Sequence, residues 1–163
     1  MRLLLRRLGL LLGASILISF LTVISLPFPE TFKVKILKEA SISPTFGIDY
    51  AVEDPLDVQV GPDVYSVPPG FVTDLASIPR PLWGIIAPNE AHFVYPAILH
   101  DYLYSCPHGL ERADIDGIFY SFLRERGVSQ FKAYQFFFAV RVFGGSHFTK
   151  HNYCHLELRV KHE

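Results

Sequence analysis

The sequence is poor in cysteine and in net charge. Of its 163 residues only two are cysteine, so at most one disulfide can form within the chain. The 15 Lys and Arg residues nearly balance 16 Asp and Glu residues, which gives a formal net charge of −1. Basic residues form no dense block either, which argues against a nucleic-acid-binding surface, and we predict no nucleic acid among the partners. Internal repeats and low-complexity tracts are also absent.

Apolar residues are abundant instead. They make up 50% of the chain, and 14% of residues are aromatic, mostly Phe and Tyr, so we expect an aromatic-rich core. This length fits one domain plus an appendage. We place the appendage at residues 1–30 and a single domain at residues 31–163.

The appendage has the pattern of a membrane anchor. Three arginines at positions 2, 6 and 7 precede Leu8 to Phe28, a run of 21 residues without a charge. Such a run can span the apolar core of a bilayer, about 30 Å thick at about 1.5 Å per residue. Basic residues before the run predict a cytoplasmic N-terminus. We therefore expect a single-pass membrane protein whose domain faces the extracytoplasmic side, with the membrane as its partner and no protein partner identified.

A cleavable signal peptide is the alternative interpretation. Val23 and Ser25 would suit positions −3 and −1 of a cut before Leu26. No cysteine follows the apolar run, so a lipoprotein signal is excluded. The run is longer than the usual signal-peptide core, which favours the uncleaved anchor over the signal peptide. A soluble core helix is a third reading, whereas the anchor and the signal peptide both export the domain.

Export would permit a disulfide between Cys106 and Cys154. The two residues lie 48 positions apart, so a bridge would stabilise the fold by about 3–4 kcal/mol in the chain-entropy model. Sequence does not show whether their Cα atoms come within reach, and both outcomes stay open.

Strand patterns fill the first half of the domain. Leu56, Val58 and Val60 alternate with polar residues, and the turn at residues 61–63 predicts a hairpin with residues 64–67. We expect further strands at residues 32–37, 47–52 and 71–72, and a turn at residues 43–45. Together they predict one small antiparallel sheet.

Helix patterns fill the second half, which predicts an α+β fold of a small antiparallel sheet followed by three packed helices. We expect Pro96 in the first turn of a helix that ends near Tyr104, unless Asn89 caps an earlier start and Pro96 kinks the helix. A second helix should cover residues 109–126, ended by Gly127. Ser129 should cap a third helix over residues 130–143.

Four stretches resemble one known family. They are Gly70-Phe-Val-Thr-Asp-Leu-Ala-Ser-Ile-Pro-Arg80, His100-Asp-Tyr-Leu-Tyr104, Ala113-Asp114 and Ala139-Val-Arg-Val-Phe-Gly144. The resemblance is to the phage and bacterial domain of unknown function family 1353 and covers roughly residues 45–147. It implies no established activity, so the chemistry must be argued from the residues.

The polar residues in these apolar stretches are the candidate site. Burying a carboxylate or an imidazole without a partner is costly, so Asp74, Ser77, His100, Asp101 and Asp114 should either satisfy one another or hold a ligand. On a helix, Asp101 lies about 100° round from His100, so the two should reach different partners. Asp114 on the next helix and the loop carrying Asp74 and Ser77 are the candidates.

Three readings of this site remain open. Asp74, His100 and Asp101 could hold a divalent cation such as Ca²⁺, Mg²⁺ or Zn²⁺. Alternatively, His100 could be a general base that Asp114 or Asp74 orients, with Ser77 supplying a hydroxyl. Both readings predict a hydrolase-like enzyme acting on an envelope component, lipid or peptidoglycan. The third reading is a non-enzymatic, phage-derived or envelope interaction module in which the same residues hold the fold together.

Overall fold

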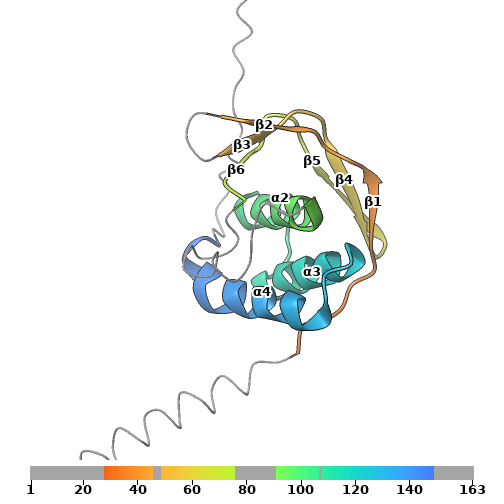
Figure 1. Ribbon diagram of the computed structural model, residues 1–163, viewed down its shortest axis with the longest axis vertical. Helices are drawn as coiled ribbons and strands as arrows, with labels where there is room; N and C mark the ends of the chain where they lie inside the picture. The colour runs from red at the N-terminus through yellow and green to blue at the C-terminus, as the bar shows by residue number, and fades with distance from the viewer. Residues whose placement is uncertain (1–27, 46–48, 76–90, 107, 149–163) are drawn as a thin grey trace, which may run out of the picture.

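The structure is a computed structural model that describes residues 28–45, 49–75, 91–106 and 108–148 (Figure 1). It is an α+β fold, in which strands precede helices along the chain. The strands are β1 (Val34–Lys38), β2 (Ile42–Pro44), β3 (Tyr50–Val52), β4 (Leu56–Val60), β5 (Asp63–Val67) and β6 (Val72–Thr73). The helices are α2 (Ala91–Ser105), α3 (Arg112–Glu125), α4 (Gln130–Phe143) and the 3₁₀ turn η2 (Gly144–Ser146).

The larger sheet has the strand order β1-β4-β5 and is antiparallel. In β4 the apolar residues Leu56, Val58 and Val60 are buried while the polar residues between them are not, as the alternation predicted. The hairpin to β5 closes at Gly61, whose φ of 57° lies in the left-handed region that glycine adopts without strain. Figure 1 shows this sheet curving over one side of α2 and α3.

A second antiparallel sheet has the order β2-β3-β6, so the expectation of a single sheet was wrong. Residues 43–45 were expected to form a turn, but Ile42 to Pro44 is a strand whose Ser43 pairs with Ala51. A three-residue strand that ends in proline is too short to show an alternating pattern. Its pairing with β3 therefore could not be read from local sequence.

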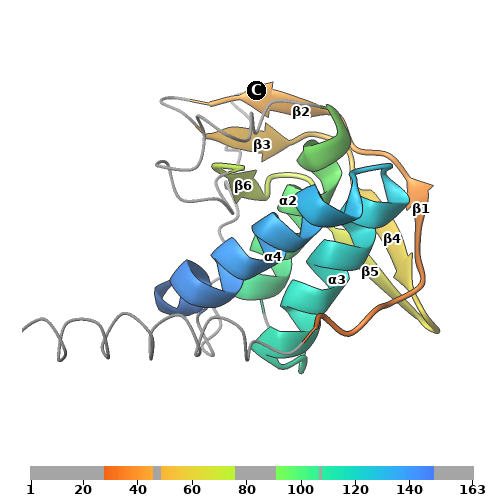
Figure 2. The ribbon, with the colours of Figure 1, turned by 60° about the horizontal axis from the view of Figure 1, so that its bottom comes forward.

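Helix α2 lies between the sheets and the other helices (Figure 2). It begins at Ala91, so Pro96 lies inside the helix, as in the alternative of an earlier start, and not in the first turn. A proline there cannot donate the hydrogen bond that the carbonyl of His92 would accept, yet the helix continues to Ser105. Ile98, Leu99 and Leu103 of the same helix are fully buried. Their packing outweighs the loss of one backbone hydrogen bond.

Helices α3 and α4 follow the expected boundaries closely. Gly127 ends α3 with a φ of 85°, and the Ser129 hydroxyl accepts the Lys132 N–H at the start of α4, as expected. A second core, rich in Phe, lies between the three helices. It contains Phe93 of α2, Phe119 of α3 and Phe136 of α4, which agrees with the aromatic composition.

Two expectations fall partly or wholly outside the described residues. Within the described part of the chain, no helix is long and apolar enough to cross a membrane. The candidate anchor, from Leu8, lies almost wholly beyond that part and stays a prediction. Cys106 is disulfide-bonded, and Cys154, the other cysteine of the chain, lies outside the described ranges.

Candidate functional site

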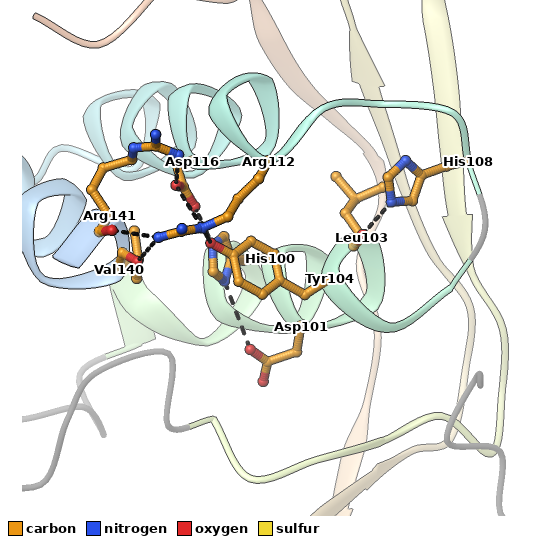
Figure 3. A network of polar contacts seen from close by, with 9 residues as sticks. All are labelled: His100, Asp101, Leu103, Tyr104, His108, Arg112, Asp116, Val140 and Arg141. Carbon is orange, nitrogen blue, oxygen red and sulfur yellow. Dashed lines mark hydrogen bonds and ion pairs between the residues drawn. The ribbon is translucent and has the colours of Figure 1, made fainter. Parts of the chain in front are cut away.

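A buried carboxylate lies where the three helices meet (Figure 3). Asp116 of α3 is 0% exposed. Its Oδ1 accepts hydrogen bonds from His100 Nε2 at 3.1 Å and from the Tyr104 hydroxyl at 2.5 Å, both on α2. Its Oδ2 accepts one from Arg141 Nη1 of α4 at 2.8 Å, and Arg112 Nε lies 3.8 Å away. We call these five residues the Asp116 cluster.

Helical spacing assembles the α2 part of the cluster. His100 and Tyr104 are four residues apart, so they share one face of α2, and their ring centroids lie 4.1 Å apart. The expectation that they share a face is confirmed. Phe119 of α3 covers the His100 ring with a centroid distance of 4.7 Å. The imidazole is therefore held by packing as well as by its bond to Asp116.

Arg112 ties the cluster to the end of α4. Its Nη2 donates to the carbonyls of Val140 and Arg141, and its Nε donates to the Tyr104 hydroxyl at 3.2 Å. The last carbonyls of a helix lack partners within the helix, so Arg112 satisfies that of Arg141 and adds a second hydrogen bond to that of Val140, which also accepts the Gly144 N–H. Gly144 completes the fit, because a Cβ there would lie only 3.1 Å from the Tyr104 hydroxyl.

The charges of the cluster stabilise one another. Burial would raise the pKa of Asp116, but the hydrogen bonds from His100, Tyr104 and Arg141 lower that pKa below its ordinary value. For His100, burial disfavours the charged ring, yet the carboxylates of Asp101 and Asp116 raise its pKa above the ordinary value. Burial and the adjacent Asp116 raise the pKa of Tyr104, so its hydroxyl stays protonated and donates.

The Nδ1 side of the His100 ring lacks the hydrogen bonds that hold the Nε2 side. His100 itself is 3% exposed, and its Nδ1 is buried and has no hydrogen-bond partner among the described residues. The nearest acidic atom is Asp101 Oδ1, at 3.8 Å, which is too long for a direct hydrogen bond. Asp101 is 19% exposed and accepts a hydrogen bond of 2.5 Å from the Thr73 hydroxyl. We call the side of the ring that faces Asp101 and Thr73 the Asp101 side.

Thr73 links the loop before α2 to this helix. Its hydroxyl donates to Asp101 and accepts the backbone N–H of Leu75 at 3.0 Å. Leu75 has a φ of 53°, which places a non-glycine residue in the left-handed region. The Thr73 hydroxyl was expected to be one of the groups that satisfy the carboxylates of the loop and the helix, and it does so for Asp101. The backbone therefore changes direction at Leu75, next to the residue that holds Asp101.

Two of the other candidate residues lie elsewhere. Asp74 is exposed in the loop after β6. Asp114 was expected to orient His100, but in the described part of the chain its side chain makes no hydrogen bond or ion pair with His100. It lies near Tyr65 of β5, whose pKa it helps to raise. Ser77 and Arg80 lie outside the described residues.

Asp116 takes the role expected of Asp114, and sequence reasoning missed it. Successive helical residues are about 100° apart, so positions 114 and 116 point to nearly opposite sides of α3. Every residue from Ile115 to Leu123 is buried. Asp114 lies within about 40° of Ile118 and Asp116 within about 60° of Phe119, so the helical phase of the apolar residues does not separate the two carboxylates.

A metal centre is not formed by the part of the chain that the structure describes. No group of three or more His, Cys, Asp or Glu side chains there could hold a metal ion. Asp101 and His100 face each other, but Asp74 is exposed and Ser77 is not described. The cation site built on Asp74, His100 and Asp101 stays a prediction.

Comparison with known proteins finds relatives without an assigned role. A family model described as "Protein of unknown function (DUF1353)" matches residues 50–140, which include His100 and Asp116. The "Uncharacterized protein y4jT" of Sinorhizobium fredii strain NGR234 is 33% identical over 98 residues. That alignment covers 59% of this chain but only 27% of the length of the relative. No solved structure matches the chain.

Proposed function

We propose a function for this chain from its own site, because the chain belongs to the DUF1353 family, a group defined as proteins of unknown function. In this proposal the protein is a hydrolase-like enzyme of the cell envelope. His100 transfers a proton at Nδ1, and Asp116 orients and charges the ring. The residues before 28 anchor the protein, with its domain on the extracytoplasmic side.

The observation that carries the proposal is the buried Nδ1 of His100, which makes no hydrogen bond and has Asp101 Oδ1 at 3.8 Å. A buried polar atom without a partner costs about 1–3 kcal/mol, so proteins seldom leave one in place. Here the other ring nitrogen is held by Asp116, which fixes the orientation of the ring. A nitrogen held in this way is suited to exchange a proton with a bound group. The raised pKa of His100 favours its acting first as an acid.

Asp101 supports the proposal from the solvent side. It is the carboxylate nearest to Nδ1, and it is partly exposed while Asp116 is not. A substrate or water that approaches the ring would therefore meet Asp101 first. Asp101 would position that group, and Thr73, which donates to Asp101, would hold the carboxylate in place.

The substrate class follows from the expected location. An anchor formed by Leu8 to Phe28, with arginines before it, would hold the domain against the outer face of the membrane. Lipids and peptidoglycan are the hydrolysable polymers and esters of that compartment. We propose one of these as the substrate.

The test uses the full chain in detergent. It is incubated separately with phospholipid vesicles and with isolated peptidoglycan, and the release of soluble products is measured. His100→Gln should abolish release, because a glutamine amide can still donate to Asp116 but cannot exchange a proton as the imidazole does. His92→Gln, which changes an exposed histidine of the same helix, is the matched control. No release by the unaltered chain from either material would overturn the proposal, and elemental analysis of the preparation would test the predicted cation.

A non-enzymatic interaction module is the second candidate. It is favoured by the complete burial of Asp116 and by its pairing with residues of all three helices. In this alternative the cluster holds the helices together and the module acts through its surface. His100→Gln would then leave partner binding unchanged.

A further inference from the structure

Exposed apolar side chains gather on one helix. Six large hydrophobic residues are exposed in the described part of the chain. Phe131, Val142 and Phe143 belong to α4, and Phe28 stacks on α4. The remaining two are Leu37 and Val64, on separate strands. Scattered exposure is ordinary, whereas a cluster of this kind marks an interaction surface.

Two exposed apolar residues of α4, with a half-buried one between them, form a stripe along the helix. Phe131, Phe138 and Val142 are spaced by seven and four residues, which places them within about 40° on a helical wheel. Ala133 and Val140, on the opposite side, are buried against α3. We call Phe131, Phe138 and Val142 the outer face of α4. Figures 1 and 2 show α4 on the outer side of the helices, away from β1, β4 and β5.

The uncharged N-terminal run ends against this helix. The run from Leu8 finishes at Phe28, whose ring stacks on Tyr134 of α4 with centroids 5.6 Å apart. Phe28 is also one of the most exposed apolar residues of the described chain, at 66%. The last residue of the apolar run therefore lies beside α4.

The charged residues of α4 itself are positive, and one of them, Arg141, pairs with Asp116. From Ser129 to Phe148 the sequence contains no Asp or Glu, and its charged residues are Lys132 and Arg141. The Lys132 amine lies over the Phe93 ring, 5.1 Å from its centroid, so its stem runs along apolar surface. Apolar side chains flanked only by cations are typical of helices that lie in the interface of a membrane with anionic lipids.

We propose that the outer face of α4 lies on the membrane surface, with Phe131 and Val142 in the headgroup region of anionic lipids. The two residues are separated by about 16 Å along the helix, so α4 would lie parallel to the bilayer. We infer the membrane and not a second copy of the chain as the occupant, because the uncharged run that ends at Phe28 reaches the same helix. This inference rests on the membrane anchoring in the proposed function and is independent of hydrolysis.

The test is photocross-linking of the full chain in vesicles of phosphatidylglycerol and phosphatidylcholine. Benzoylphenylalanine replaces Phe131 in one variant and Val64 of β5 in the control, since Val64 is also exposed but lies away from α4. We expect severalfold more lipid adduct at position 131 than at position 64. Removing phosphatidylglycerol should lower the adduct at position 131.

Each other outcome overturns the inference in a recognisable way. A cross-linked dimer at position 131 would mean that a second copy covers the face. Equal and low lipid adducts at both positions, in a chain that floats with the vesicles, would leave the anchor intact and remove α4 from the membrane. A chain that does not float at all would overturn the anchor together with this inference. Product release by His100 would be unaffected in each case.

Discussion

The two sides of the His100 ring carry the same type of residue in opposite settings. On one side, Asp116 is fully buried and accepts hydrogen bonds from His100, Tyr104 and Arg141. On the other side, Asp101 is partly exposed and stands 3.8 Å from the ring without a direct bond. Buried and fully paired carboxylates serve the fold, because losing a partner there is very costly. A carboxylate that solvent reaches can serve a ligand.

The comparison distinguishes the residues that hold the His100 ring in place from the ring nitrogen that could exchange a proton. The Asp116 cluster fixes its position and charge, and the Asp101 side leaves one nitrogen available. A purely structural histidine would be expected to satisfy both nitrogens. The changes below test this division, from the largest expected effect to the smallest.

Asp116→Ala should destabilise the protein most. It leaves Arg141 and His100 buried without their carboxylate, which should lower the free energy of unfolding by about 3–5 kcal/mol. Urea denaturation of the full chain in detergent, followed by circular dichroism, measures this loss. A loss below about 1 kcal/mol would mean that the cluster contributes little, because that is the worth of one ordinary hydrogen bond.

Replacing His100 by glutamine or by asparagine should separate the role of Nε2 in stability from the role of Nδ1 in activity. A glutamine amide can reach the place of Nε2 and keep the bond to Asp116, whereas an asparagine amide is one carbon shorter and cannot. His100→Asn should therefore lower the free energy of unfolding by about 1–3 kcal/mol, and His100→Gln by less. Both should abolish product release. The division fails if the two variants are equally stable, or if either one retains activity.

The sequence predicted local structure better than the assembly of the site. Alternation at Leu56, Val58 and Val60 and the cap at Ser129 depend on neighbours in the chain, and both were confirmed. Strand β2 was missed because its only support is pairing with β3, which short-range patterns do not contain. Of the two starts of α2 that the sequence left open, the earlier one is observed, and tertiary packing overrides the preference of proline for the first turn.

At the site, the sequence located His100 but not its partners. The spacing of His100 and Tyr104 follows from helix geometry, whereas the approach of Arg141 depends on how α4 crosses α3. No local pattern encodes that crossing. Asp116 was not identified by sequence reasoning, because buried apolar residues of α3 share a helix face with Asp114 as well as with Asp116.

The stabilisation contributed by Asp116 should be lost at low pH, and that contributed by His100 should be lost at high pH. The pKa of Asp116 is lowered, so its stabilisation is present above its ordinary pKa of 3.8 and is lost as the pH falls through the folded value. The pKa of His100 is raised, so its stabilisation is present below its ordinary pKa of 6.5 and is lost as the pH rises through the folded value. Melting temperature measured against pH should therefore fall at both ends.

Asp101→Asn should change only the alkaline end of that profile. It removes one of the two carboxylates that raise the pKa of His100, so the decline should begin at a lower pH. The acid decline belongs to Asp116 and should stay where it is. An unchanged alkaline decline would show that Asp101 has no electrostatic hold on the ring.

Asp114→Asn should have the smallest effect. The residue points away from His100, toward the larger sheet, so the free energy of unfolding should change by less than about 0.5 kcal/mol and product release should not change. The pKa of Tyr65 is raised by burial first, then by Asp63 and Asp114. Removing one of those charges should lower the pKa of Tyr65, which NMR of labelled tyrosines can follow. If Asp114→Asn instead abolished product release while leaving the pKa of Tyr65 unchanged, the carboxylate would act at His100, and Asp116 would lose its place as the residue that orients the ring.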